Sequence, residues 1–187
     1  MRKLPFITMA LLLAATVLSA CFKDSDGENG KYANWNKANQ AWIIEQSNLI
    51  DEKTGKSYYK ECVAPWDADA KVYIHWYNDT NLTRDNLKPF YTSMVDVKYK
   101  GRLYDGTPFD SSYLRTSPAA GVYRTRLGSN VIEGWSIALM NMHVGDTCRV
   151  LLPYNVAYGS NGSGSVIKPF SALQFELKLE NIYKLEE

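Results

Sequence analysis

Residues 97–112 have the sequence Val97-Lys98-Tyr99-Lys100-Gly101-Arg102-Leu103-Tyr104-Asp105-Gly106-Thr107-Pro108-Phe109-Asp110-Ser111-Ser112, and this stretch decides the fold. Together with Val95 just before it, Val97 and Tyr99 alternate with charged residues. Successive side chains of a β-strand point to opposite faces, so this alternation predicts a half-buried strand. The Asp105-Gly106 pair then favours a tight turn, after which Phe109 opens the returning segment. The stretch therefore predicts an antiparallel hairpin with one apolar face.

The sequence that follows predicts a short helix and two more strands. Trp135, Ala138, Leu139 and Met142 recur at helical spacing, whereas residues 147–153 and 172–182 have strand character. Loops are expected at 111–123, which contains Pro118 and Gly121, and at the Gly/Ser-rich segment 159–165. Because strands outnumber helices, we expect an α+β fold in which a mostly antiparallel β-sheet wraps around a short central helix.

The sequence before the hairpin predicts an N-terminal helical extension and two further strands. Residues 32–49 contain neither Pro nor Gly and place Trp35, Ala38, Trp42 and Ile43, with Leu49 as a further candidate, at helical spacing. This helix either packs on its own domain, the interpretation we favour, or docks on a partner chain. Aromatic and β-branched residues then predict strands at 58–63 and 71–77, followed by a loop at 78–88.

The first thirty residues have the pattern of an export signal. Arg2 and Lys3 precede an apolar run, residues 4–18, that is short for a spanning helix. Leu18-Ser19-Ala20-Cys21 resembles the lipobox of bacterial lipoproteins, which implies cleavage before Cys21 and lipidation of that cysteine; the alternative is an ordinary secretory signal. Residues 22–30 are polar and predict a flexible tether. Within them, residues 23–26 resemble the export signal of surface lipoproteins in the Bacteroidetes, although a solvated linker explains them equally well.

Length and composition exclude several classes of protein. A chain of 187 residues holds one ordinary domain and an appendage, and its net charge of +1 argues against a nucleic-acid-binding protein. His75 and His143, the only histidines, lack the spacing of metal ligands, and the loop 159–165 lacks the Lys-Ser/Thr of a phosphate cradle. We therefore expect neither a metal nor another cofactor.

Three segments together resemble the FKBP-type peptidyl-prolyl cis-trans isomerases. They are residues 97–112, then residues 131–146, which begin Val131-Ile132-Glu133-Gly134-Trp135, and finally residues 152–175 with Ala157-Tyr158-Gly159 and Val166-Ile167-Lys168-Pro169. They occur in the family's order across residues 94–182. With the lipobox, this resemblance suggests a bacterial lipoprotein form of the family. It divides the chain into a signal peptide (1–20), a lipidated cysteine and tether (21–31), a helix and linker (32–56) and an isomerase domain (57–187).

The resemblance also implies a substrate pocket. Catalytic positions of the family fall on Tyr99, Phe109, Asp110, Trp135, Tyr158 and Phe175, and further substrate-binding positions fall on Val131, Ile132, Ile167 and Tyr123. In this pocket Trp135 is the floor under the proline ring, while the Ile132 N–H and the Tyr158 hydroxyl hold substrate carbonyls. We expect Asp110 to orient the Tyr158 hydroxyl or a carbonyl dipole.

The implied activity is rotation of Xaa-Pro bonds in exported, proline-containing polypeptides, with macrolides such as tacrolimus as candidate inhibitors. A protein lipidated at Cys21 acts at a bacterial membrane outside the cytoplasm, with the outer membrane as the favoured site. The chain departs from the family in a longer loop after Ser112 and in Lys168 at the loop tip. These departures motivate an alternative to the isomerase, a non-catalytic peptide-binding or chaperone lipoprotein with the same fold. A third hypothesis is a structural surface lipoprotein that dimerises through the helix 32–49.

Cys62 and Cys148 remain open to two interpretations. Both lie in segments with strand character, and outside the cytoplasm they either pair as a disulfide or serve as small core residues.

Overall fold

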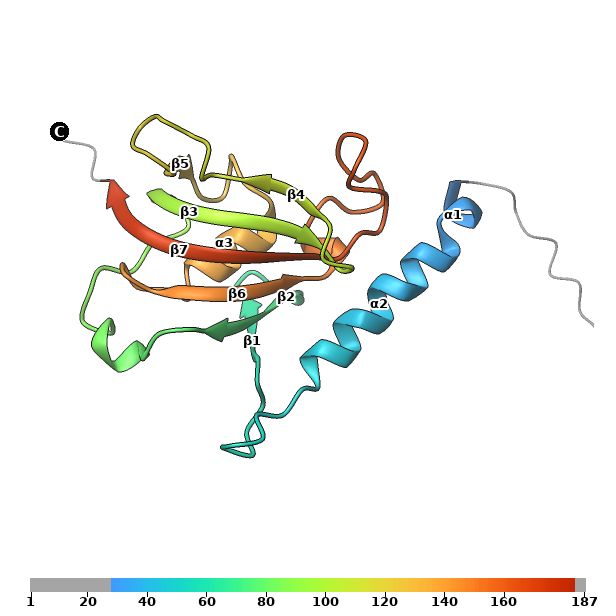
Figure 1. The fold of residues 1–187 in the computed structure, drawn as a ribbon, viewed down its shortest axis with the longest axis horizontal. Helices are drawn as coiled ribbons and strands as arrows, with labels where there is room; N and C mark the ends of the chain where they lie inside the picture. Colours follow the sequence, from blue (N-terminus) through green and yellow to red (C-terminus); the bar gives the residue numbers. More distant parts are fainter. Residues whose placement is uncertain (1–27, 184–187) are drawn as a thin grey trace, which may run out of the picture.

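The computed structural model describes residues 28–183, in which a seven-stranded antiparallel sheet packs against helix α3 (Glu133–Leu139), as Figure 1 shows. The strands are β1 (Lys60–Ala64), β2 (Asp67–Trp76), β3 (Met94–Leu103), β4 (Pro108–Ser111), β5 (Tyr123–Arg126), β6 (Thr147–Leu152) and β7 (Leu173–Tyr183). Their order in the sheet is β1-β2-β6-β7-β3-β4, and β5 also pairs with β3. The predicted α+β fold is confirmed.

The centre of the sheet is the long pair β3 and β7. Both strands alternate buried and accessible side chains over most of their length, which is the pattern that predicted them. Tyr99 of β3 pairs with Leu177 of β7, and Gly101 pairs with Phe175. Gly101 also pairs with Asp110 of β4 on its other side, so three strands carrying expected site residues meet at this glycine.

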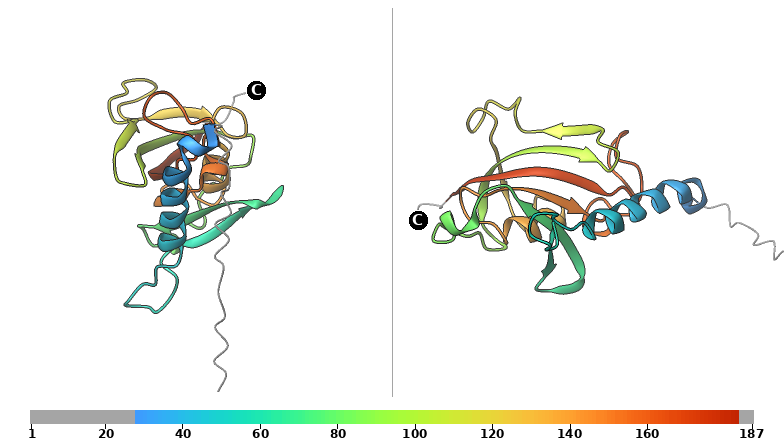
Figure 2. Two further views of the ribbon diagram at one scale, coloured as in Figure 1. Left: turned by 90° about the vertical axis from the view of Figure 1, so that its right-hand side faces the viewer. Right: turned by 60° about the horizontal axis from the view of Figure 1, so that its bottom comes forward.

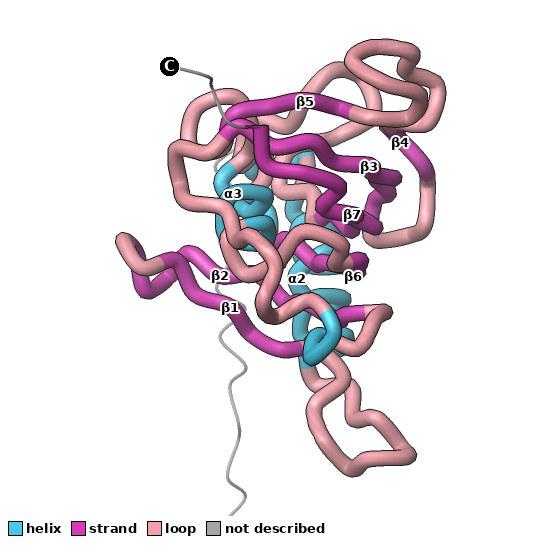
Figure 3. The backbone as a smooth tube through the Cα atoms, turned by 90° about the vertical axis from the view of Figure 1, so that its left-hand side faces the viewer, coloured by secondary structure: helices cyan, strands magenta, loops and turns pink. Residues whose placement is uncertain are grey.

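Helix α3 is short but almost wholly enclosed. Residues 134–139 are all buried, and the helix lies against one face of the sheet, where it contacts β1 and β2 (Figure 3). Its apolar side chains join those of β2, β3, β6 and β7 in one core that includes Trp135, Leu139 and Met142. The backbone of α3 thus fixes the position of Trp135, and side chains of the sheet pack around its ring.

The N-terminal extension forms helices α1 (Glu28–Lys31) and α2 (Ala33–Ser47). Helix α2 lies beside the sheet domain, where β3 ends and β7 begins, which both views of Figure 2 show. Asn39 and Ile43 are its buried residues, and Trp35 and Trp42 meet Tyr104 edge-on, with ring centroids 5.1 and 6.4 Å apart. The helix therefore packs on its own domain.

Several boundaries differ from the sequence-based expectation. Residues 28–31, expected in the flexible tether, are helical, and Leu49 lies beyond the end of α2 and is exposed. Strand β5 was not expected, because its sequence Tyr-Arg-Thr-Arg has no apolar alternation and its pairing with β3 is a tertiary effect. Short 3₁₀ helices occur at η1 (Thr80–Leu82) and η2 (Tyr154–Val156).

The signal peptide, the lipobox with Cys21 and most of the tether lie outside the described residues. Within residues 28–183, no helix is both long and apolar enough to cross a membrane. Cys62 and Cys148 are both buried and both free, so the interpretation as core residues holds and the disulfide does not.

Candidate functional site

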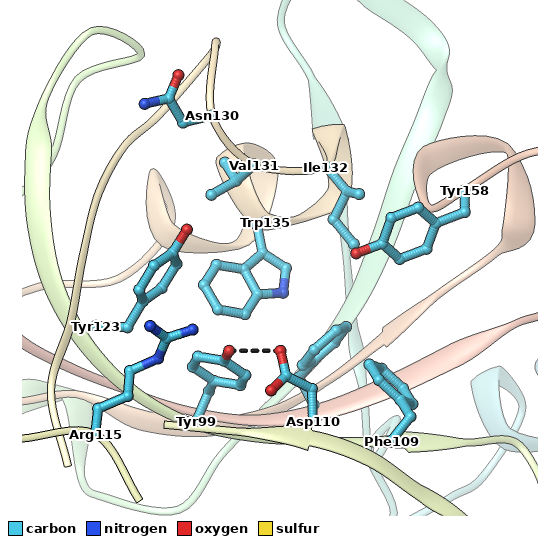
Figure 4. Close-up of a pocket in the computed structure, with 11 residues that line it drawn as sticks. Tyr99, Phe109, Asp110, Arg115, Tyr123, Asn130, Val131, Ile132, Trp135 and Tyr158 are labelled. Atoms are coloured by element: carbon cyan, nitrogen blue, oxygen red, sulfur yellow. Dashed lines mark hydrogen bonds between the residues drawn. The ribbon is translucent and has the colours of Figure 1, made fainter. Parts of the chain in front are cut away.

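A pocket of about 140 Å³ opens between α3 and the strands β3, β4, β5 and β7 (Figure 4). Its lining consists mainly of aromatic rings with a few polar groups: Tyr99, Phe109, Asp110, Arg115, Tyr123, Asn130, Val131, Ile132, Trp135, Tyr158 and Phe175. Nine of the ten catalytic and substrate-binding residues predicted from the sequence are among them, which places these candidates together in space.

Trp135 is the hub of the aromatic cluster. Its ring meets Tyr99 edge-on at a centroid distance of 4.9 Å and Phe175 at 5.3 Å, while Tyr123 lies farther away at 6.3 Å. Edge-to-face contacts of this kind are the favoured geometry of aromatic pairs. Trp135, Tyr99 and Phe175 are each less than 5% exposed, so the rings form a rigid, water-poor surface.

Gly101 explains how two of these rings fit together. The Phe109 and Phe175 rings lie perpendicular to each other with centroids 5.5 Å apart, and both approach the Gly101 Cα. A Cβ at this position would lie 2.7 Å from Phe109 Cζ and 2.8 Å from Phe175 Cε1, well inside van der Waals contact. The absence of a side chain on β3 therefore permits the wall of the pocket.

Asp110 is bound by Tyr99. The Tyr99 hydroxyl donates to Asp110 Oδ2 at 2.6 Å, and the Ser111 N–H donates to Asp110 Oδ1 at 2.7 Å (Figure 4). Burial raises the pKa of the Tyr99 hydroxyl, and the bond to Asp110 raises it further. The expected partner of Asp110 was the Tyr158 hydroxyl or a carbonyl dipole, but the donor in the structure is Tyr99. The reason is that Asp110 pairs with Gly101, which shares a face of β3 with Tyr99.

Tyr158 and Ile132 form the open side of the pocket. Tyr158 follows η2, is 37% exposed, and points its hydroxyl toward the pocket beside Ile132 (Figure 4). Burial raises the pKa of this hydroxyl, with Asp110 adding to the effect, so it remains a hydrogen-bond donor at neutral pH. The Ile132 N–H precedes the first turn of α3 and has no acceptor among the described residues.

Ile167 does not line this pocket. It is 7% exposed and lies in an adjoining hollow of about 260 Å³, which it shares with Phe109, Asp110 and Tyr158. Ile167 therefore lies behind the rim of the pocket, which the loop 158–171 forms, and does not contribute to the lining. The loop folds back on itself and so carries Ile167 into the adjoining hollow.

Arg115 and Asn130 also line the pocket, although no sequence pattern predicted them. The Arg115 guanidinium lies 4.6 Å from the centroid of the Tyr123 ring, a distance typical of a cation–π contact. It sits in the loop between β4 and β5, whose path no periodicity could predict. Figure 4 shows the Arg115 guanidinium beside the Tyr99 ring, with the Asp110 carboxylate on the other side of that ring.

The groups that line the pocket are suited to non-covalent binding of a ligand. Among the described residues, neither histidine nor cysteine lines the pocket, and its hydroxyl groups have no adjacent general base other than the bound Asp110. The pocket instead presents ring faces and edges to an apolar group and places hydrogen-bond donors at its margin. An arrangement of this kind suits a small apolar ring flanked by carbonyl groups.

Comparison with known proteins gives a consistent result. The family model described as FKBP-type peptidyl-prolyl cis-trans isomerase matches residues 87–180. The FKBP-type 22 kDa peptidyl-prolyl cis-trans isomerase of Escherichia coli K12 is 44% identical over 94 residues, which are 50% of this chain and 43% of that protein. The Outer membrane protein MIP of Legionella longbeachae is 39% identical over 97 residues, 52% of this chain and 40% of that protein.

A solved structure extends the likeness to the fold. The crystal structure of a peptidyl-prolyl cis-trans isomerase from Pseudomonas syringae pv. tomato has a TM-score of 0.63 and 30% sequence identity. The match covers 82% of this chain and 96% of that one. The two curated relatives are longer, and the aligned region spans less than half of each.

Proposed function

The chain belongs to the family of FKBP-type peptidyl-prolyl cis-trans isomerases, and from this premise we propose that it catalyses the rotation of Xaa-Pro peptide bonds in polypeptides. The observation that carries the proposal is the aromatic pocket over Trp135, in which the candidate residues of three separate sequence segments converge. A pocket of about 140 Å³ is of the order needed for a proline ring.

The reaction requires no nucleophile. Rotation about a peptide bond disrupts amide resonance, with a barrier of about 18–20 kcal/mol, and Xaa-Pro bonds exchange in tens to hundreds of seconds without a catalyst. The twisted amide has less charge separation than the planar one, so a water-poor pocket stabilises it relative to the ground state. The rings of Trp135, Tyr99 and Phe175 provide such surroundings.

Hydrogen bonds at the margin orient the substrate. The Ile132 N–H, which has no acceptor within residues 28–183, donates to a substrate carbonyl, and the Tyr158 hydroxyl donates to a second one. Asp110 acts on Tyr99, whose hydroxyl it binds, and so holds the ring edge toward Trp135. Each tenfold acceleration requires about 1.4 kcal/mol of extra transition-state binding, which one such hydrogen bond and desolvation can supply.

An exchange assay on Xaa-Pro peptides tests the activity. The full chain in detergent, measured by NMR exchange or by a protease-coupled assay, should accelerate isomerisation, and tacrolimus should compete for the same pocket. Rates equal to those of the buffer would overturn the proposal. Trp135→Ala is the matched inactive variant, because it removes the floor of the pocket.

A second function is favoured by the loop between β4 and β5. Tyr113 is 53% exposed and Leu114 is 93% exposed in this loop, which also supplies Arg115 to the pocket. Such side chains suit a peptide-binding or chaperone role without turnover. This alternative predicts that suppression of aggregation survives Trp135→Ala and is lost in Tyr113→Ser/Leu114→Ser, while isomerisation stays at background.

We further propose that the protein is a lipoprotein tethered through Cys21 and acts on exported polypeptides at the outer membrane. The lipobox-like Leu18–Cys21 supports this, as does the similarity to a protein named for the outer membrane. Mass spectrometry of the N-terminal peptide should detect acyl groups on Cys21, and Cys21→Ser should release the protein from membranes. Surface exposure, which the Bacteroidetes-like residues 23–26 suggest, is tested by protease treatment of intact cells.

A further inference from the structure

Helix α2 is bonded to the loop 158–171 that forms the rim of the pocket, and we propose that Trp35 on this helix is a positioning residue for the isomerase site. The inference rests on the proposed function. It assigns a role in substrate binding to the N-terminal extension, which lies outside the region that the family model matches, residues 87–180.

Trp35 contacts the end of the rim loop in two ways. Its indole Nε1 donates to Ser171 Oγ at 3.1 Å, and the Ser171 hydroxyl donates to the Lys168 carbonyl oxygen at 2.7 Å. The Lys168 ammonium group also lies 4.5 Å from the centroid of the Trp35 ring. Lys168, which distinguishes this loop tip from the family pattern, is therefore held by the helix and turned away from the pocket, whose lining does not include it.

Asn39, one turn later on α2, fixes the same segment. Its side-chain oxygen accepts from the Ala172 N–H at 2.7 Å, and its amide nitrogen donates to the Trp35 carbonyl at 2.7 Å. Asn39 is 1% exposed and Ser171 is 2% exposed, so water cannot replace these bonds. Hydrogen bonds in such surroundings specify a single arrangement, because breaking them leaves buried polar groups unsatisfied.

The loop transmits this support to the pocket. The Phe170 N–H donates to the Gly159 carbonyl at 2.9 Å, so the segment held by α2 is bonded to the residue that follows Tyr158. Farther out, the Ser163 N–H donates to the Ile167 carbonyl at 2.7 Å. Backbone hydrogen bonds within the loop thereby link Tyr158 and Ile167 to the segment that Trp35 holds through its side chain.

The sequence of the loop makes external support necessary. Gly159, Gly162 and Gly164 all adopt positive φ, and Gly residues lose more conformational entropy on ordering than any other type. A loop that is not held would populate several arrangements, and only the fraction with Tyr158 over the pocket would bind substrate well. Apparent affinity falls in proportion to that fraction.

The test compares kcat and KM for an Xaa-Pro tetrapeptide, using the full chain in detergent. Trp35→Ala should raise KM about fivefold or more while kcat changes less than about twofold, because the chemistry at Trp135 is unchanged. Trp35→Phe keeps a ring against Tyr104 and Lys168 but loses the donor to Ser171, so it should give an intermediate KM. Trp42→Phe is the control, since Trp42 meets Tyr104 without bonding to the loop.

Hydrogen–deuterium exchange supplies a readout that does not depend on activity. The amides of Ile167 and Phe170 should lose protection in Trp35→Ala and keep it in Trp42→Phe, with thermal unfolding confirming that both variants fold. Unchanged protection and unchanged KM in Trp35→Ala would overturn the positioning role. If the wild-type chain is inactive, the proposed function fails, and the exchange data alone decide whether α2 holds the loop.

Discussion

The Tyr99 hydroxyl donates a 2.6 Å hydrogen bond to the Asp110 carboxylate, joining strands β3 and β4 at the mouth of the pocket. The same tyrosine is fixed at its backbone, because its N–H donates to Ser112 Oγ and its carbonyl accepts from the Ser112 N–H. A side chain held at both ends presents its ring edge to Trp135 without losing entropy when substrate binds. Asp110 is accordingly a positioning group for the aromatic wall.

Tyr99→Phe tests this relationship through the pH dependence of stability. At pH 7 the variant should be less stable by about 1 kcal/mol, the usual value of one such hydrogen bond. In the unfolded chain the hydroxyl ionises near pH 10, whereas the folded state, in which the pKa of Tyr99 is raised, keeps its proton. The wild type therefore loses stability as pH rises above about 10, and the variant lacks this contribution.

The difference in unfolding free energy between the two proteins should accordingly shrink between about pH 10 and pH 11.5. Urea denaturation at a series of pH values measures it directly. A difference that stays constant over that interval would show that Tyr99 titrates alike in the folded and unfolded chains, contrary to the geometry.

Tyr158, unlike Trp135, should separate catalysis from stability. Trp135→Ala should destabilise the fold by about 3–5 kcal/mol, because it empties a site in the core, and should abolish isomerisation. Tyr158→Phe removes only a partly exposed hydroxyl, so the unfolding free energy should change by less than about 0.5 kcal/mol. Its kcat/KM should fall about tenfold, the equivalent of one hydrogen bond to the substrate. Wild-type kcat/KM in Tyr158→Phe would remove this hydroxyl from the mechanism.

The fold could be predicted from local sequence patterns, whereas most of the pocket could be predicted only from the resemblance to the FKBP family. Apolar residues alternate in β3 and β7 and recur at helical spacing in α3, because each element buries one face. Burial of one face produces a periodic pattern of apolar residues in the sequence. The resemblance to the family then identified Trp135, Tyr99 and Phe175 on these elements as pocket residues.

What the sequence did not predict depends on the paths of loops. Arg115 enters the pocket from a loop without periodicity, and the partner of Asp110 was set by strand register that no motif encodes. The contact between Trp35 and Ser171 joins residues 136 positions apart, so the helical pattern of residues 32–49 could suggest docking but not its target. Tertiary packing determines such contacts, and local propensity carries no information about them.

The two cysteines of the domain should behave as inert core residues. Burial raises the pKa of both thiols, and Cys148 lies 3.6 Å from the Met142 sulfur in a site with no solvent exposure. Iodoacetamide at pH 8 should therefore modify Cys62 and Cys148 at least about 100-fold more slowly in the native protein than in 6 M guanidinium. Peptide mapping by mass spectrometry provides the measurement. Rapid native labelling, or recovery of a Cys62–Cys148 linked peptide, would contradict the packing described.

Gly101→Ala should damage the pocket without touching any group that contacts substrate through hydrogen bonds. The new Cβ would lie within 2.8 Å of atoms in both Phe109 and Phe175, and these rings are packed against the backbone and each other. They must move by several tenths of an ångström, and overpacking of this kind typically costs about 1–3 kcal/mol. Because the displaced rings form the wall, kcat/KM should fall about tenfold or more in proportion to the misfit.

Gly30→Ala is the matched control, since a Cβ at residue 30 meets nothing within 4 Å. It should leave both stability and kcat/KM at wild-type values. Activity and thermal unfolding measured on both variants separate a local effect on the wall from a general effect of replacing glycine. If Gly101→Ala isomerises peptides as well as the wild type while folding normally, Phe109 and Phe175 can shift without consequence, and the rigid aromatic wall cannot be the source of catalysis.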